Sequence, residues 1–172
     1  MNNKYYYLIA SLPSLKFNTK PLINKETFFE ECRKWLTSQD LLILNTVDTN
    51  VKFINIINNN FLINWYDYNL KLKTELAILR DPSRKNMDSV NASAESRKIM
   101  EQVNPLLKEK AYEKFRWDFL DSEETKYNFD LNILIIYLEK LKILDRLFLF
   151  NKELGYKKFE VLKETYYEHA IR

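Results

Sequence analysis

The sequence has a single glycine and four prolines among its 172 residues. A β-sandwich or β-barrel normally uses many glycine-containing turns, so this scarcity argues against a β-rich fold. Loops that cradle phosphate also need several glycines, because a Cβ atom would keep the backbone away from the anion. The sequence therefore excludes a P-loop, a dinucleotide-binding fingerprint and the nucleophile elbow of α/β-hydrolases.

Cysteine and histidine are equally scarce, with one of each. Cys32 allows no intrachain disulfide, which suits a reducing compartment. It follows Phe28 at helical spacing, so we expect a buried apolar residue rather than a reactive thiol. We expect His169 to be solvated, with a Cys32–His169 dyad as the weaker alternative. Zinc and di-iron sites need several such ligands, so no metal and no cofactor is expected.

The charges are nearly balanced, with 27 basic and 24 acidic residues and a net charge of +3. Neither half of the chain concentrates basic residues as a nucleic-acid-binding surface does, so no nucleic-acid partner is expected. The segment 5–12 is rich in tyrosine and lacks the cleavage pattern of a signal peptide. The apolar run 133–138 is far shorter than the about 20 residues of a membrane-spanning helix. We expect a soluble protein that meets membranes only through partner proteins.

Apolar residues recur at helical spacing, which predicts an all-α fold, an irregular multi-helix bundle with little or no β-structure. The predicted helices span about 5–12, 25–36, 39–44, 61–80, 97–103, 105–120, 130–148 and 155–166. For 5–12 an extended segment is the alternative, because β-branched and aromatic residues favour strands. Asn24, Ser38 and Asn104 are the expected N-caps, since their side chains can accept hydrogen bonds from the first turn. The segment 51–57 is ambiguous, and 58–60 reads as a loop. The helix 130–148 is so apolar that we expect it at the centre of the C-terminal part.

The chain length suits one helical domain, 1–172, or two helical lobes that share a core, 1–81 and 97–172. The segment 82–96 between these lobes is polar and contains mostly small residues. Such composition is typical of loops, so we expect a mobile connection there.

Two groups of residues form the expected partner interface. On the predicted helix 61–80, Trp65 is expected in the core and its neighbouring tyrosines on an outer face, where aromatic side chains anchor interfaces. Basic residues flank the segment 82–96, either as ordinary surface charge or as a docking patch for an acidic partner. The candidate interface residues are Tyr66, Tyr68, Arg80, Arg84, Lys85 and Arg97.

Acidic residues occur as adjacent pairs at 30–31 and 123–124. Neighbouring residues on a helix point in different directions, so we expect solvated faces rather than an acid–base pair. No converging set of acid, base and nucleophile is visible, which predicts a protein without catalytic residues. An enzyme with an unusual carboxylate or tyrosine site is the alternative.

Four stretches in this order resemble a known family. They are Tyr5–Pro13, Phe61–Tyr68, Arg116–Asp121, and Phe129–Leu138 with Leu141 and Leu144, and the stretch Lys152–Phe159 also fits. The chain resembles a family of bacterial proteins encoded within V/A-type ATPase operons, where they take the place of the ATPase's C subunit, the counterpart of the eukaryotic d subunit. The resemblance covers most of the chain in scattered blocks, and none of them is a catalytic signature.

The resemblance implies a helical adaptor that sits on the membrane rotor ring and grips the central stalk. Its partners would be the other V/A-type ATPase subunits, and its location would be cytoplasmic, peripheral to the inner membrane. Torque transmission through a rigid helical body requires no catalytic residue and no cofactor. From the residues alone, a free-standing helical protein-interaction adaptor is the alternative.

Overall fold

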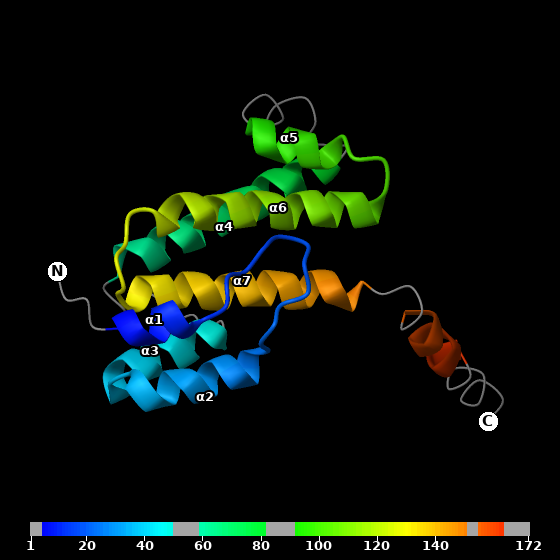
Figure 1. The fold of residues 1–172 in the computed structure, drawn as a ribbon. Coiled ribbons are helices and arrows are strands. Elements are labelled where there is room, and N and C mark those ends of the chain that lie inside the picture. The colour runs from blue at the N-terminus through cyan, green and yellow to red at the C-terminus, as the bar shows by residue number, and fades with distance from the viewer. Residues whose placement is uncertain (1–4, 50–58, 82–91, 151–154, 164–172) are drawn as a thin grey trace.

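The computed structural model describes residues 5–49, 59–81, 92–150 and 155–163, and within these ranges it contains helices and no strand. The predicted all-α class is therefore confirmed. The helices are α1 (Tyr6–Ser11), α2 (Lys25–Trp35), α3 (Ser38–Asp48), α4 (Asn60–Arg80), α5 (Ala94–Met100), α6 (Pro105–Glu124) and α7 (Leu131–Leu149). Residues 155–163 form one more helix, which stands apart from the bundle in Figure 1.

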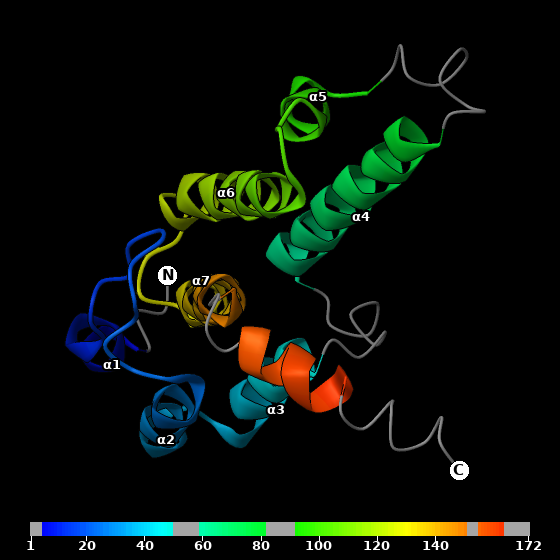
Figure 2. The same ribbon diagram turned by 90° about the vertical axis from the view of Figure 1, so that its right-hand side faces the viewer.

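Helix α7 is the axis of the molecule. The helices α1, α2 and α3 lie on one side of it, and α4, α5 and α6 lie on the other (Figures 1 and 2). Its side chains Leu134, Ile135, Ile136 and Leu138 are fully buried. A helix that is apolar on nearly all sides has to be covered on several sides, which explains its central place. We expected this helix at the centre of the C-terminal part, and the N-terminal helices pack against it as well.

One hydrophobic core joins the two sides of the bundle. Leu8, Phe28 and Leu44 from the first three helices belong to the same buried cluster as Phe61 of α4 and Trp117 of α6. Helix α4 lies beside α5 and α6 (Figure 2). The core therefore extends across the boundary that the sequence suggested between two lobes.

The starts of α2 to α7 follow from capping side chains, whereas α1 begins after Tyr5 without a side-chain cap. Asn24, Asn104 and Asp130 each accept hydrogen bonds from backbone N–H groups of the first turn. The predicted cap Ser38 was wrong by one residue, because Thr37 Oγ1 accepts the hydrogen bond, at 3.2 Å, and Ser38 is already helical. Capping chemistry is local, so the sequence locates it to within about a residue.

Several predicted boundaries shift by up to four residues, about one helical turn. Residue 60 begins α4 instead of ending a loop, and 94–96 form the first turn of α5 instead of the end of a polar connection. Helix α5 ends at Met100, before the predicted residue 103, and α6 continues to Glu124. The ambiguous segment 51–57 lies outside the described residues, as does most of the segment 82–96.

Two predictions about single polar residues have opposite outcomes. Cys32 is fully buried, and burial, with a smaller effect of Glu31, raises the pKa of its thiol to about 12. Its predicted role as a buried apolar residue is confirmed. Glu123 was expected on a solvated face but is buried, with Lys126 Nζ 2.5 Å from its Oε1. His169 lies outside the described residues.

A carboxylate of α4 accepts hydrogen bonds from the start of α5. Glu75 Oε2 accepts hydrogen bonds from the Ser93 N–H at 3.0 Å, the Ser93 hydroxyl at 2.5 Å and the Ser96 hydroxyl at 2.7 Å. Burial alone would raise the pKa of Glu75, but these donors and the nearby Lys71 outweigh it and lower the pKa. Ser93 is the N-cap of α5, so this contact fixes α5 on α4.

Replacing a core residue of α7 should destabilise the whole bundle. We expect Leu138→Ala to lower the free energy of unfolding by about 2–5 kcal/mol, because it leaves a cavity in a fully buried position. Urea unfolding followed by circular dichroism and by tryptophan fluorescence should give one common midpoint. The matched variant Leu42→Ala, at a position 69% exposed on α3, should change the free energy of unfolding by less than about 1 kcal/mol. Equal losses in both variants would contradict the central place of α7.

The Glu75 contact predicts a dependence of stability on pH. Because the pKa of Glu75 is lower in the folded protein, its stabilising effect is complete above the unfolded pKa and is lost as pH falls through the folded pKa. Glu75→Gln should therefore cost about 1–3 kcal/mol at neutral pH and much less in acid. Urea unfolding midpoints of wild type and variant, measured from neutral to acid pH, should therefore converge as the pH falls. Asp67→Asn, at an exposed site of α4, is the control and should remain close to wild type throughout.

Candidate functional site

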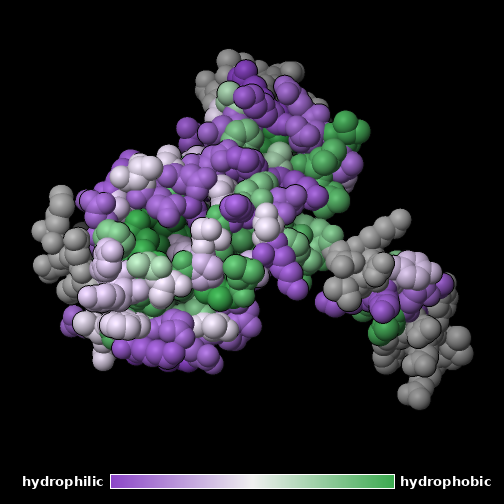
Figure 3. All heavy atoms as spheres, viewed as in Figure 1, coloured by the Kyte–Doolittle hydropathy of each residue, from purple (hydrophilic) through white to green (hydrophobic). Residues whose placement is uncertain are grey.

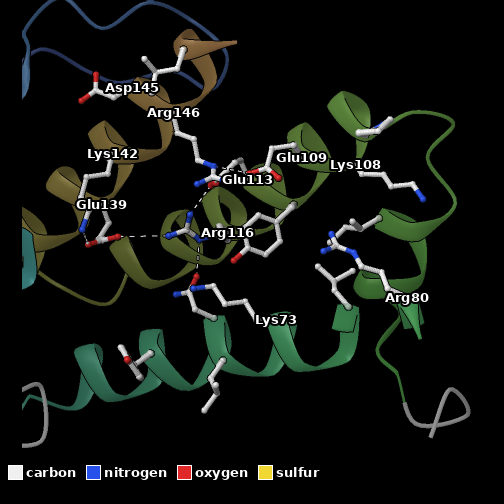
Figure 4. A pocket seen from close by; sticks show the side chains of 18 of the residues that line it. Lys73, Arg80, Lys108, Glu109, Glu113, Arg116, Glu139, Lys142, Asp145 and Arg146 are labelled. Atoms are coloured by element: carbon white, nitrogen blue, oxygen red, sulfur yellow. Dashed lines mark hydrogen bonds and ion pairs between the residues drawn. The ribbon is translucent and has the colours of Figure 1, made fainter. Parts of the chain in front are cut away.

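A wide cleft opens between α4, α6 and α7 (Figure 4). Its volume is about 1230 Å³, and seven basic and four acidic side chains line it. Figure 4 shows α4 along one wall and the charged side chains of α6 and α7 along the other. Eleven charged side chains face this one cleft, so we treat it as the candidate site.

A network of ion pairs centred on Arg116 of α6 forms the floor of the cleft. Arg116 Nη1 lies 2.7 Å from Glu113 Oε2, and Nη2 lies 3.8 Å from Glu139 Oε2 on α7. Its Nε donates a hydrogen bond to Asn69 Oδ1 on α4 at 2.7 Å. The guanidinium group also lies 5.0 Å from the ring centre of Trp65, close enough for a cation–π contact. One side chain thus joins α6 to both α4 and α7.

Arg146 and Lys142 of α7 extend the network. Arg146 Nη2 lies 2.5 Å from Glu109 Oε1, and its Nε lies 3.1 Å from Glu113 Oε1. Lys142 Nζ lies 2.8 Å from Glu139 Oε1. With Arg116, three basic side chains therefore meet three acidic ones. The floor of the cleft is electrically neutral.

Glu113 is the most deeply buried member of this network. Its side chain has no exposed surface, and burial raises the pKa of its carboxyl against the opposing effect of Arg116 and Arg146. A carboxylate removed from water is stable only when cations and hydrogen bonds compensate the loss of hydration. The neighbouring Tyr112 hydroxyl is buried without a hydrogen-bond partner among the described residues, and burial raises its pKa too.

Three further cations line the cleft without an acidic partner in the described part of the chain. They are Lys73 and Arg80 of α4 and Lys108 of α6, and none forms an ion pair with any residue in those ranges. The remaining lining charges, Lys25 and Asp145, lie close enough to influence each other and are opposite in sign. The excess positive charge of the cleft therefore belongs to these three cations.

Two of the predicted interface residues lie at this cleft. Tyr66 is exposed on α4 and lines the cleft, as does Arg80 at the end of the same helix. Arg97 is exposed on α5 but is not part of the lining. Arg84 and Lys85 lie outside the described residues. Tyr66 and Arg80 thus line the same cleft, and their role in binding a partner stays a prediction.

Tyr68 does not lie on an outer face, so that expectation was wrong. Its hydroxyl is 3.1 Å from Glu95 Oε2 and 3.2 Å from the Phe115 carbonyl oxygen. Its ring stacks on that of Phe119 with 4.3 Å between the ring centres. The reason is that α5 and α6 cover this side of α4. Trp65 beside it is in the core as predicted.

Sequence reasoning missed the ion-pair network entirely. A local signal was present, since Glu113 and Arg116 are three residues apart, as are Glu139 and Lys142, and such pairs lie on one face of a helix. The contact of Arg146 with α6 has no such signal, because it depends on how two helices are aligned. Lys73 and Lys108 were also missed, as isolated lysines carry no motif.

The described residues include no group of three or more His, Cys, Asp or Glu side chains that could hold a metal ion. Within the same ranges, every helix is too short or too polar to cross a membrane. Comparison with protein-family models, with curated proteins and with solved structures finds no match to this chain. The chemistry of the cleft itself is therefore the basis for interpreting it.

The buried network predicts unequal effects of two similar substitutions on α6. Arg116→Met should lower the free energy of unfolding by about 3–5 kcal/mol, because Glu113 stays buried while it loses its closest cation. Lys114→Met is the matched control, since its ion pair with Asp118 is exposed and worth only about 0–1 kcal/mol. Urea unfolding measures both values. Adding Glu113→Gln to Arg116→Met should recover part of the loss, and no recovery would show that charge is not its cause.

Proposed function

We propose that this chain is a non-catalytic structural subunit of a V/A-type rotary ATPase, an adaptor of the C/d type that links the central stalk to the membrane rotor ring. Its partners are the other subunits of that ATPase, and it acts in the cytoplasm at the periphery of the inner membrane. It requires neither a cofactor nor a nucleic acid for this role.

The proposal is supported above all by where the four stretches that resemble the family lie. The stretch 5–13 contains α1, and the stretch 129–138 contains the start of α7. The Tyr5 N–H donates a hydrogen bond to the Phe129 carbonyl oxygen at 3.1 Å. The rings of Tyr6 and Phe129 are 4.7 Å apart. These two stretches are therefore in direct contact although they are far apart in sequence.

The other two stretches meet in the same manner. Trp65, from the stretch 61–68, lies 5.7 Å from Phe119 between ring centres, and Phe119 belongs to the stretch 116–121. Arg116 of the latter stretch lies over the Trp65 ring. Residues that form the contacts of a core are the ones that related proteins share for packing reasons. The arrangement supports interpreting the scattered blocks as parts of one fold.

The mechanics of the bundle also suit an adaptor. A body that transmits torque has to resist sliding of one helix along another. The long helices α4, α6 and α7 are held together by the Arg116 contacts as well as by apolar packing. Directional ion pairs and hydrogen bonds fix the alignment of helices more narrowly than apolar contacts do. A rigid body of this kind passes force from one partner to the other.

Purification of the native complex tests the proposal. We expect an affinity-tagged form of the chain, expressed at its natural level, to co-purify from gently solubilised membranes with V/A-type ATPase subunits in constant ratio. Deletion of the gene should uncouple ATP hydrolysis from ion transport in membrane vesicles, because the stalk would lose its link to the ring. An untagged strain controls for non-specific recovery. An intact, coupled ATPase that lacks this chain would rule the proposal out.

A free-standing protein-interaction adaptor is the second candidate. It is favoured by exposed apolar side chains on the helix 155–163, where Tyr156, Phe159 and Leu162 recur at helical spacing and are all exposed. Such a face suits contact with another protein, whichever pathway that protein belongs to. This alternative predicts partners in the soluble fraction and an unchanged membrane ATPase after deletion of the gene.

A further inference from the structure

We propose that the cleft between α4, α6 and α7 is a docking site for an acidic amphipathic helix of a partner protein. Such a site rests on the proposed function, since it gives the adaptor one of its contact surfaces and states the chemistry of what binds there. The occupant follows from the charge of the cleft and from its apolar lining.

The charge of the cleft calls for an acidic occupant. Lys73 and Arg80 are seven residues apart on α4, which places them on one face about 10 Å from each other along the helix. Lys108 lines the cleft from α6 (Figure 4). The six charges of the floor neutralise one another, so these three cations remain to attract a ligand. Acidic side chains two turns apart on an incoming helix match the spacing along α4.

The apolar lining indicates that the ligand has an apolar face as well as acidic groups. Val103 at the turn between α5 and α6 is 93% exposed, Leu149 at the end of α7 is 75% exposed and Leu70 of α4 is 56% exposed, and all three line the cleft. Figure 3 shows a hydrophobic patch over the turn between α5 and α6. Apolar side chains this exposed favour an occupant with an apolar face. An amphipathic helix in a groove offers an apolar face and an acidic one together.

Other occupants fit less well. A small phosphorylated ligand needs donors that converge on one point, whereas these cations are spread along two helices. The helix 155–163 of the same chain carries Lys157, Lys158 and Lys163 against the single acidic residue Glu160, so the positive cleft repels it. Nucleic acid would satisfy the cations but leave the apolar lining exposed.

The test uses a synthetic peptide and the full chain. The probe is a fluorescent helix of about 18 residues, close to the length of α7, with leucines at helical spacing on one face and glutamates on the other. We expect saturable one-to-one binding by fluorescence anisotropy, weakened by added salt. The variant Lys73→Glu, Arg80→Glu, Lys108→Glu should bind at least tenfold more weakly. The same peptide with lysines in place of its glutamates should not bind.

A matched variant separates the cleft from the net charge of the protein. Lys16→Glu, Lys20→Glu, Arg33→Glu makes the same change in charge at exposed positions outside the cleft, and it should bind the peptide like wild type. Leu149→Gln should weaken binding without changing its salt dependence, because it removes only apolar contact. Circular dichroism verifies that each variant is folded.

Four results would overturn the docking site. These are no saturable binding of the peptide to wild type, equal weakening by the two triple variants, tighter binding of duplex DNA than of the acidic peptide, and self-association of the chain that the cleft variant abolishes. The peptide contains no ATPase sequence, so its failure to bind leaves the proposed function to the co-purification experiment. Conversely, if the peptide binds but the chain does not co-purify with ATPase subunits, the docking site stands and the proposed role in a rotary ATPase is rejected.

Discussion

The carboxylate of Glu113 has no access to water and lies between two guanidinium groups from different helices, Arg116 of α6 and Arg146 of α7. Desolvation of a charged group costs several kcal/mol, and only a close cation of correct geometry offsets it. Sliding α6 along α7 by even part of a turn would separate these groups while leaving the carboxylate buried. Apolar contacts tolerate such a shift much better, because one leucine can replace another against the same surface. The alignment of the bundle is therefore set by this buried charge, while its stability comes mainly from the apolar core around α7.

Helix α4 is held to this pair of helices by different contacts along its length. Near its first half, Asn69 and Trp65 contact the Arg116 guanidinium, and further along, Glu75 holds the start of α5. Between these attachments and the end of α7 the helices separate into the cleft. The side chains that close the floor of the cleft are thus the same ones that fix the helices around it. The six paired charges therefore set the shape of the cleft, while its excess positive charge comes from Lys73, Arg80 and Lys108.

Sequence reasoning succeeded where a feature depends on neighbouring residues and failed where it depends on distant ones. The caps Asn24 and Asn104 and the buried helix α7 follow from local chemistry and periodicity, and both were predicted correctly. Tyr68 was misplaced because periodicity gives the faces of a helix but not which face a later helix will cover. The pairing of Arg146 with Glu109 joins residues 37 positions apart and has no counterpart in any local pattern. The candidate site was found only in part for this reason: Tyr66 and Arg80 were identified, and the charges beneath them were not.

The pairing of charges also bears on the role that we propose for the cleft. A general acid or base has to present a titratable group that can exchange a proton with a bound substrate. In the floor of this cleft each carboxylate of the network already faces a basic side chain, and moving a proton onto it would leave that cation uncompensated. Three cations of the lining, Lys73, Arg80 and Lys108, have no acidic partner in the described part of the chain and can attract anions. Combined with exposed leucine and valine side chains, they form the surface on which the proposed docking site rests. A rigid bundle with such a surface suits the structural role that we propose, because that role requires contact with other proteins.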